Sequence, residues 1–239
     1  MKIGLISDIH GNYAALGQVI RELKTEGVDI IVNAGDNAGY SSGHEDCVKL
    51  LMDENIPGCM GNYDEAVGFD RPICGCGESD DEALMKMRAA SLKWARENAS
   101  PKTKKYLSLL PQKLEIAAGN TMILAVHGGL DTLNEMIMKD EVGKMEGIAV
   151  KTSAEIVVMG HTHTPFFKKI SGKIFVNPGS VGRPIDGDPR ASYGLLRIDG
   201  DIQVELRRTV YDVEGNIRDL TAAGLPAEIG EALRNGREI

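Results

Sequence analysis

Short apolar runs alternate with amphipathic segments through the first quarter of the chain. The runs at residues 2–7, 29–35 and 56–62 each have the length and apolar content of a buried strand. Asn12 precedes a segment whose apolar residues recur with helical spacing, which predicts a helix that Asn12 caps. A second helix is predicted at residues 45–55. This order of strands and helices favours parallel strands joined by crossover helices.

The rest of the chain has a different pattern. A polar, glycine-rich loop at residues 70–83 precedes a predicted helix with Met87 and Trp94 on one face. Another helix begins near Pro101, because proline is favoured at the first position of a helix. Apolar and alternating segments then predict strands at 113–118, 121–126, 155–159, 166–170, 173–177, 192–198 and 202–209.

Glycine turns join two pairs of these later strands, at Ser171-Gly172 and at Asp199-Gly200, and favour antiparallel hairpins. No repeat, low-complexity segment or interdomain linker separates the two halves of the sequence. We therefore expect one domain over residues 1–239. Its class should be mixed α/β (α+β), with two packed mixed β-sheets flanked by helices.

Composition and charge restrict the function further. The chain is 42% hydrophobic and 26% charged, as in an ordinary globular protein. Its net charge of −8 makes duplex nucleic acid an unlikely partner, but it leaves room for a small phosphorylated ligand. No apolar run approaches the roughly 18 residues of a membrane-spanning helix, so we expect no membrane association and a cytoplasmic location.

The four cysteines are expected to be free thiols in that compartment. They are Cys47, Cys59, Cys74 and Cys76. The Cys74-Gly-Cys76 pair supplies only two thiols, whereas a structural zinc site usually needs four ligands.

Polar side chains of the kinds that bind metals follow five of the predicted strands, each beside glycine. In chain order they are Asp8 with His10, Asp36, Asn62, His127, and His161 with His163. The fifth histidine, His44, lies near a helix start and is expected to be solvated. Because ligands bind at the carboxyl ends of strands in open α/β sheets, we expect the set to converge on one rim. Any single motif is weak, so the inference depends on the whole set.

The order of these motifs is D-x-H, G-D, G-N-x-[DE], H-G-G and G-H-T-H. It resembles the calcineurin-like metallophosphoesterase superfamily, and in particular its small bacterial and archaeal phosphodiesterase-type members. The resemblance extends from Asp8 to about Arg183, and the segments "GDNAGY" (35–40) and "NPGSVGRP" (177–184) add to it. It implies a four-layer fold of two packed mixed sheets flanked by helices, in agreement with the class predicted from the pattern.

The resemblance also implies a site for two divalent metal ions. Asp8, His10 and His163 would hold one ion, Asn62, His127 and His161 would hold the other, and Asp36 would bridge them. These donors suit Mn²⁺, with Fe, Zn²⁺ or Ni²⁺ as alternatives. The expected reaction is hydrolysis of a phosphodiester or small phosphate ester by a metal-activated hydroxide. Two ions, two carboxylates and one hydroxide leave a charge of about +1, which would attract phosphate to an acidic protein.

Tyr63 departs from the family pattern. Most of the superfamily has histidine after the metal-binding asparagine, where it assists the leaving group. A phenol with a pKa of about 10 is neutral at pH 7 and is a weak acid beside imidazolium. Two interpretations stay open, in which Tyr63 acts with Asn62 as a catalytic residue or is only a wall of the site.

An alternative function is a catalytically weak scaffold or binding protein with the same fold. A retromer subunit of the superfamily is such a protein, and it too departs at the position of Tyr63. Every metal-ligand position is filled in this chain, which favours the enzyme. Arg183 is a candidate phosphate contact and equally a candidate surface residue, and the loop at 70–83 is a candidate lid. The sequence leaves open the substrate, the native metal and the oligomeric state.

Overall fold

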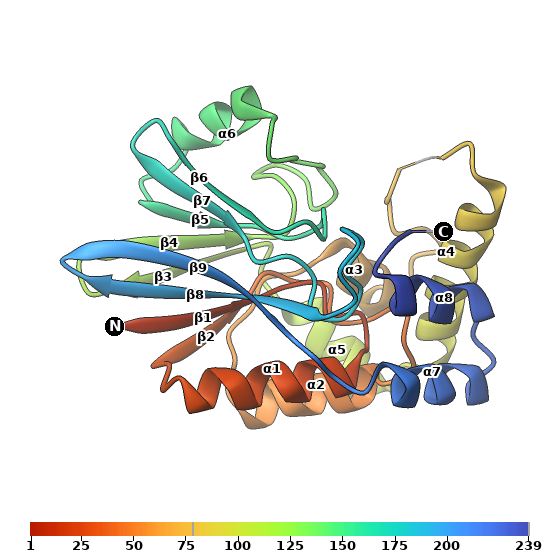
Figure 1. The fold of residues 1–239 in the computed structure, drawn as a ribbon. Coiled ribbons are helices and arrows are strands. Elements are labelled where there is room, and N and C mark those ends of the chain that lie inside the picture. The colour runs from red at the N-terminus through yellow and green to blue at the C-terminus, as the bar shows by residue number, and fades with distance from the viewer. Residues whose placement is uncertain (78, 239) are drawn as a thin grey trace.

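Two mixed β-sheets lie at the centre of the computed structural model, which describes residues 1–77 and 79–238 (Figure 1). Within these residues, one sheet has the strand order β2-β1-β8-β9 and the other has the order β3-β4-β5-β7-β6. The strands are β1 (Lys2–Ile6), β2 (Ile30–Asn33), β3 (Lys113–Ala118), β4 (Thr121–Val126), β5 (Ile156–Val158), β6 (Phe166–Ile170), β7 (Lys173–Asn177), β8 (Ala191–Asp199) and β9 (Asp201–Thr209).

Helices cover the outer faces of both sheets. In the described residues they are α1 (Tyr13–Thr25), α2 (His44–Asp53), α3 (Asn62–Gly68), α4 (Glu82–Asn98), α5 (Pro101–Leu109), α6 (Val142–Ala149), α7 (Val213–Ala222) and α8 (Ala227–Asn235). Helices α1 and α2 pack on the first sheet and α6 on the second, while α4, α7 and α8 gather at one end (Figure 1). The predicted mixed α/β class with two mixed sheets is confirmed. None of the helices in the described part is long and apolar enough to cross a membrane.

The core between the two sheets follows the alternation of side chains along a strand. Ile3 and Leu5 of β1 point into it, whereas Ile6 packs on the other side, against the residues of α1. Ile123 of β4 and Ile156 of β5 meet the same inter-sheet core, and all of these side chains are fully buried. Burial of this kind contributes about 25 cal/mol per Å² of apolar surface to the free energy of unfolding. The packed sheets therefore form a stable support for the loops at their ends.

Parallel pairing places the loops that follow neighbouring strands at the same end of each sheet. β1 pairs in parallel with β2, and β4 pairs in parallel with β5. β8 runs antiparallel to β1 and thereby joins the two halves of the sequence in one sheet. The predicted hairpins β6–β7 and β8–β9 are confirmed as antiparallel pairs.

The strand predicted at residues 56–62 is wrong. Only Gly58 of this segment forms a β-bridge, to Asn33, and Asn62 is the first residue of α3. Pro57 has no N–H to donate to a ladder, which limits the pairing of this segment. Asp64 accepts a hydrogen bond from the backbone N–H of Gly61 at 3.1 Å and so stabilises the start of the helix instead.

His44 was predicted to be solvated, and this is also wrong. It is the first residue of α2 and only 1% exposed, with its ring packed edge-on against Trp94 at 5.3 Å. Helices α6, α7 and α8 were not predicted, because their apolar faces are short and include small residues such as Gly230.

Candidate metal centre

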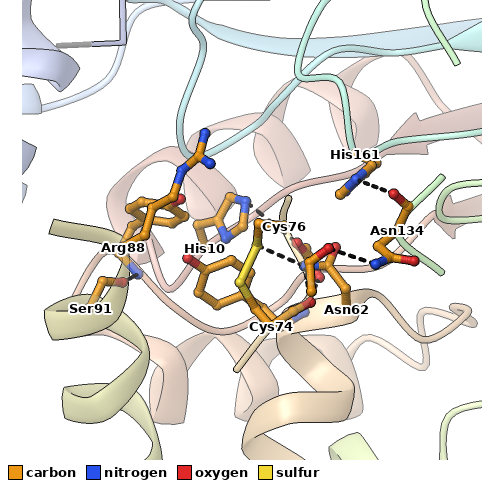
Figure 2. Close-up of a disulfide and its surroundings, with 12 residues drawn as sticks. His10, Asn62, Cys74, Cys76, Arg88, Ser91, Asn134 and His161 are labelled. Atoms are coloured by element: carbon orange, nitrogen blue, oxygen red, sulfur yellow. Dashed lines mark hydrogen bonds and ion pairs between the residues drawn. A yellow bond between two sulfur atoms is a disulfide. The ribbon is translucent and has the colours of Figure 1, made fainter. Parts of the chain in front are cut away.

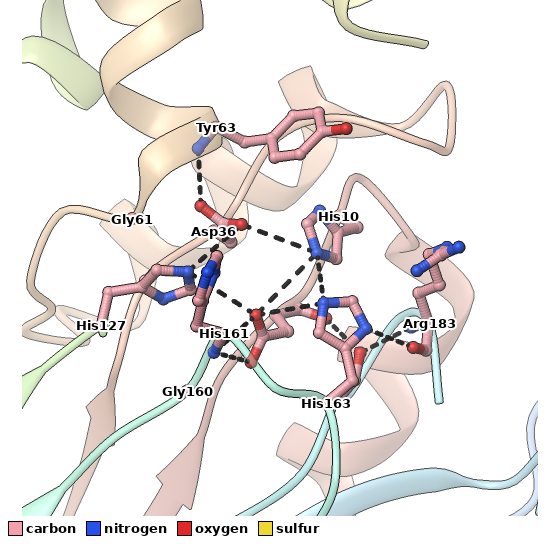
Figure 3. A network of polar contacts seen from close by, with 12 residues as sticks. His10, Asp36, Gly61, Tyr63, His127, Gly160, His161, His163 and Arg183 are labelled. Atoms are coloured by element: carbon pink, nitrogen blue, oxygen red, sulfur yellow. Dashed lines mark hydrogen bonds and ion pairs between the residues drawn. The ribbon is translucent and has the colours of Figure 1, made fainter. Parts of the chain in front are cut away.

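The carboxyl ends of β1, β2, β4 and β5 carry the polar side chains that the sequence singled out, except Asn62, which is the first residue of α3 (Figure 3). Ligand atoms of Asp8, His10 and His163 lie within 4.8 Å of one another, and so do those of Asp8, Asp36 and His127. All five side chains are buried. Because Asp8 belongs to both sets, the structure places two adjoining groups of potential metal ligands at this rim.

Backbone carbonyls orient three of these histidines. The Nδ1–O distances are 3.1 Å for His10 and Ala38, 2.8 Å for His127 and Ala34, and 2.6 Å for His163 and Arg183. An Nδ1–H that donates to a carbonyl leaves the lone pair on Nε2, which is the usual arrangement of metal-binding histidines. The Nε2 atoms of His10 and His163 lie 3.1 Å apart. Two lone pairs at that distance need a proton or a cation between them, so the donor set fits a bound metal ion.

The two carboxylates lie between the imidazoles. Asp8 Oδ1 is 3.4 Å from Nε2 of His163, and Asp36 Oδ2 is 3.3 Å from Nε2 of His127 and 3.7 Å from Nε2 of His10. Asp36 therefore faces histidines of both groups, which is the position that a bridging ligand would need (Figure 3).

Asn62 points its amide oxygen at the second group. Its Oδ1 lies 3.1 Å from Nε2 of His127. The amide nitrogen donates to the carbonyl oxygen of Cys74 at 3.1 Å and to Sγ of Cys76 at 3.2 Å (Figure 2). These bonds settle the orientation of the amide, so that the oxygen and not the nitrogen faces the cluster.

The expectation of four free thiols is wrong for the loop beside Asn62. Cys74 and Cys76 form a disulfide, whereas Cys47 and Cys59 are free and buried. The sequence could not distinguish these states, because the pairing depends on how the loop folds back over α3 and α4. Gly75, between the two cysteines, has a φ of +67°, a conformation that glycine adopts readily.

His161 lies at the edge of the cluster. Its backbone N–H donates to Asp8 Oδ1 and Oδ2 at 3.2 and 3.1 Å, and its ring lies 5.1 Å from the ring of His127. Its Nε2 lies 3.1 Å from the carbonyl oxygen of Asn134, whose own amide donates to Gly75 of the disulfide loop (Figure 2). The structure therefore brings the His161 ring beside the second group, with Nε2 directed to the carbonyl of Asn134.

Five of the clustered residues have left-handed backbone conformations. The φ angles are 53° for Asp8, 48° for His10, 57° for Asp36, 67° for His161 and 56° for His163. Residues other than glycine adopt this conformation rarely and at a cost of about 1–3 kcal/mol each. Strain of this kind gathers at functional sites, because the surrounding structure enforces it where a side chain must be aimed.

Burial and charge pairing set the protonation states. Burial lowers the pKa of His10 and of His161 to about 4, so both rings are neutral at pH 7 and keep a lone pair. Burial raises the pKa of Asp8 to about 7. Burial also opposes charge on His127 and Asp36, but their mutual attraction outweighs it and raises the pKa of His127 to about 10 while it lowers that of Asp36. The neutral rings of His10 and His161 beside the buried carboxylates favour the binding of a cation.

Asp64 holds the loop that carries Asp36, a role that the sequence reasoning missed. Its carboxylate accepts from the backbone N–H of Asp36 at 2.9 Å and of Asn37 at 2.7 Å, and from the Asn37 side chain at 2.9 Å. Asp64 is fully buried. Asp64 is the last position of the motif G-N-x-[DE], so the sequence could have singled it out. The motif does not show which groups Asp64 binds.

Tyr63 contributes to the site through its backbone. Its N–H donates to Asp36 Oδ1 at 2.8 Å, and in Figure 3 the ring extends away from that carboxylate. The ring is 1% exposed and packs edge-on against His10 at 5.3 Å. The hydroxyl has no hydrogen-bond partner among the described residues, and burial raises the pKa of Tyr63 well above 10.

A cleft of about 310 Å³ opens onto this cluster. Tyr63, Asn62 and His163 form part of its wall. Arg88 and Glu238 also line it, although no sequence motif singles out either residue. Arg183, left open by the sequence, lines the same cleft and is 3% exposed, so it is not a surface residue.

Two mixed sheets with buried carboxylates and imidazoles at their parallel strand ends agree with the architecture that the motif order implied. Residues 1–201 match the calcineurin-like phosphoesterase superfamily domain, and the chain belongs to this superfamily. The resemblance predicted from the motif order is thus confirmed. Membership makes the chain a phosphoesterase of a kind that uses divalent metal ions.

Individual relatives extend over the full chain. An uncharacterized protein of Methanocaldococcus jannaschii, MJ0912, is 28% identical over 252 residues, which cover 98% of each chain. The crystal structure of a metallophosphoesterase from Sphaerobacter thermophilus has a TM-score of 0.79 at 26% identity and covers 99% of this chain and 100% of its own. The hypothetical protein PH1004 of Pyrococcus horikoshii OT3 has a TM-score of 0.82 at 22% identity, with coverages of 100% and 99%.

Proposed function

We propose that the protein hydrolyses a phosphodiester or a small phosphate ester at a dinuclear metal centre. Asp8, His10 and His163 hold one ion in this proposal. Asn62, His127 and His161 hold the other, with Asp36 between the two groups. Mn²⁺ is the proposed metal, because carboxylate, imidazole and amide oxygen donors all suit it. When bound, the two ions supply an activated water and neutralise charge on the phosphoryl group.

One observation carries the proposal: three buried histidines donate Nδ1–H to backbone carbonyls and direct Nε2 toward two buried carboxylates. A purely structural cluster would satisfy both ring nitrogens with protein partners. Instead, the Nε2 atoms of His10 and His163 face each other at 3.1 Å. The cluster also opens on a cleft, so a phosphate ester has access to it.

The remaining residues of the site act by position. The backbone N–H of Tyr63 fixes Oδ1 of Asp36, and the Asp64 carboxylate fixes the backbone of the loop that carries Asp36. Asn62 keeps its oxygen toward the cluster because the disulfide loop binds its nitrogen. We assign Tyr63 to the wall of the site, since a buried phenol with a raised pKa does not protonate a leaving group at pH 7. Leaving-group protonation then comes from solvent, which favours esters with good leaving groups.

The test is turnover of bis(p-nitrophenyl) phosphate and p-nitrophenyl phosphate by the Mn²⁺-loaded protein, with and without chelator. We expect chelator-sensitive turnover, and the ratio of the two rates assigns the protein as a diesterase or a monoesterase. Asp36→Asn should lower turnover by at least about 100-fold, because the removed charge faces both groups. Asp131→Asn, which changes an exposed carboxylate paired with Lys151, is the matched control.

The scaffold alternative gives the opposite pattern in the same experiment. Its expected result is no chelator-sensitive turnover of either ester by wild-type protein that contains metal. Metal content, measured by elemental analysis of wild type and Asp36→Asn, separates a metal-free preparation from a protein that binds metal without catalysis.

A further inference from the structure

Two arginines converge on a single carboxylate oxygen in the cleft beside the metal centre. Nη2 of Arg88 and Nη2 of Arg183 each lie 3.0 Å from Oε1 of Glu238. Their side chains are 19% and 4% exposed, so both guanidinium groups are largely removed from bulk water. Arginine pairs of this geometry are typical of sites that bind phosphate or carboxylate groups.

The arginines offer more hydrogen-bond donors than Glu238 uses. Nε of Arg88 and Nε of Arg183 are buried and have no partner among the residues that the structure describes. A buried donor without a partner costs about 1–3 kcal/mol, and one carboxylate oxygen does not satisfy two guanidinium groups. A phosphate group has three terminal oxygens and therefore matches this set of donors better than the carboxylate does.

Other parts of the fold hold the two arginines in place. The Arg183 guanidinium lies over the Tyr40 ring, 4.2 Å from its centre, and the backbone carbonyl of Arg183 orients His163. Arg88 lies one turn before Ser91 on α4, and Ser91 accepts a hydrogen bond from the backbone N–H of Tyr40 at 2.6 Å. The anchors of both arginines are thus fixed before any ligand arrives, which lowers the entropic cost of binding.

Glu238 reaches the cleft through a short pairing near the C-terminal end of the described chain. The backbone N–H of Gly187 donates to the carbonyl of Gly236 at 2.7 Å, and Arg237 forms a β-bridge with Asp186. Glu238 itself is about one-third exposed. Burial opposes its ionisation, but the two arginines outweigh this and hold the pKa of Glu238 below its usual value. Glu238 is therefore an anion that occupies the arginine pair, on a segment with few other anchors.

The distance from this pair to the metal centre is short. The Tyr40 ring packs against residues of both sites: the Arg183 guanidinium lies 4.2 Å from its centre, and the ring of His10 lies 4.8 Å away between ring centres. His10, Arg88, Arg183 and Glu238 line the same cleft. A ligand with one anionic group at the metal ligands and a second at the arginines needs to span little more than one aromatic ring.

We propose that Arg88 and Arg183 form a second anion subsite, which binds a second phosphate group of an organic bisphosphate while the first lies at the metal centre. Glu238 occupies this subsite in the free protein and is displaced by substrate. The inference rests on the proposed phosphoesterase function and narrows it to substrates with two phosphate groups joined by a short spacer.

The test compares alkanediol bisphosphates of increasing chain length with alkyl monophosphates of the same length, by phosphate release from the Mn²⁺-loaded protein. We expect the best bisphosphate to have a KM about tenfold or more below that of its matched monophosphate, because the second phosphate adds charge-assisted hydrogen bonds. Equal KM values for every matched pair would overturn the subsite.

Variants assign the effect to the arginines. Arg88→Gln should raise the KM of the bisphosphate about tenfold and thereby reduce the preference for it over the monophosphate. Lys86→Gln is the control, since it removes a positive charge from an exposed position of the same helix. Glu238→Gln should lower the KM of the bisphosphate about threefold or more, because an occupied subsite raises the apparent KM. The assignment of the subsite to these residues would be contradicted if Arg88→Gln kept the preference for the bisphosphate over the monophosphate. An unchanged KM of the bisphosphate in Glu238→Gln would contradict it as well.

A binding measurement separates failure of the subsite from failure of the proposed function. Calorimetric titration of chelator-treated wild type and Arg88→Gln with the best bisphosphate detects the subsite without turnover. Binding that is lost in Arg88→Gln supports the subsite even if no ester is hydrolysed. Chelator-sensitive turnover of p-nitrophenyl phosphate together with equal bisphosphate binding by both proteins would refute the subsite and leave the phosphoesterase intact. Thermal unfolding of each variant within a few degrees of wild type excludes misfolding as the cause.

Discussion

Replacement of Gly61 by alanine should displace Asp36 without changing any polar group of the site. A Cβ at position 61 would lie 2.0 Å from Asp36 Oδ1 and 2.3 Å from the Asp36 backbone nitrogen. The φ of −95° and ψ of 173° at Gly61 suit alanine, so the backbone conformation itself adds no strain. The effect of Gly61→Ala is therefore steric and directed at one proposed metal ligand.

The size of the effect follows from the overlap. Real Cβ contacts essentially never fall below 3.0 Å, so a contact of 2.0 Å requires a shift of about 1 Å between Gly61 and Asp36. Overpacking of this kind costs about 1–3 kcal/mol, which lowers the melting temperature by roughly 2–12 °C in a chain of this length. A displacement of about 1 Å at a reacting group costs on the order of 100-fold in rate. We expect Gly61→Ala to lose metal and about 100-fold in kcat/KM.

The assay compares metal content, turnover of p-nitrophenyl esters and thermal unfolding of Gly61→Ala with those of Gly147→Ala. Gly147 lies on α6, and a Cβ there meets no atom within 4 Å. Alanine at an exposed helix position is about 1 kcal/mol more favourable than glycine, so this control should keep its activity and unfold at a slightly higher temperature. Wild-type metal content and turnover in Gly61→Ala would refute the placement of Asp36 in the centre.

Three further predictions test other parts of the structure. Tyr63→Phe should keep kcat for both p-nitrophenyl esters within about threefold, because the hydroxyl has no partner among the described residues; a loss of 100-fold or more would make Tyr63 a catalytic residue. Asn12→Ala should destabilise the protein by about 2–3 kcal/mol in denaturant unfolding, since Asn12 caps α1 and donates to the carbonyl of Gly182 at 2.9 Å; a change below about 0.5 kcal/mol would contradict this. Thiol titration of the unreduced, unfolded protein should find the two free thiols of Cys47 and Cys59, and four after reduction; four at the outset would contradict the disulfide.

The sequence predicted most of the strands because their signals are local. β3, β4, β6 and β7 have the bounds expected from the pattern, and Asn12 caps α1 as predicted. Apolar content, alternation and turn residues all lie within a few positions of one another in such segments. The ligand types at the strand ends were visible for the same reason, since each follows its strand directly.

The prediction failed where a distant partner decides the local structure. The segment at 56–62 has the composition of a strand, but Asp64 receives backbone N–H groups from both Gly61 and Asp36 and begins a helix there. His44 has the sequence environment of an exposed helix start, but Trp94 of α4 packs on its ring and the side chain is buried. Asp36 and Trp94 are the distant partners, and neither can be inferred from the residues on either side of the segment it contacts.

The difference between local and distant signals also explains why the residues of the cluster could be picked out from the sequence while their geometry could not. The loops after β1 and β2 are joined by backbone hydrogen bonds, from Asp8 to Gly35, from His10 to Asp36 and from Gly11 to Asn37, each at 2.9 Å. These bonds hold Asp8, His10 and Asp36 in left-handed conformations that neither loop would keep alone. The conformation of each loop therefore depends on the other, and a displacement of the Asp36 loop should also displace His10. For that reason the loss of metal in Gly61→Ala should extend to both ions, whereas a loss confined to one of them would show that the two loops are set independently.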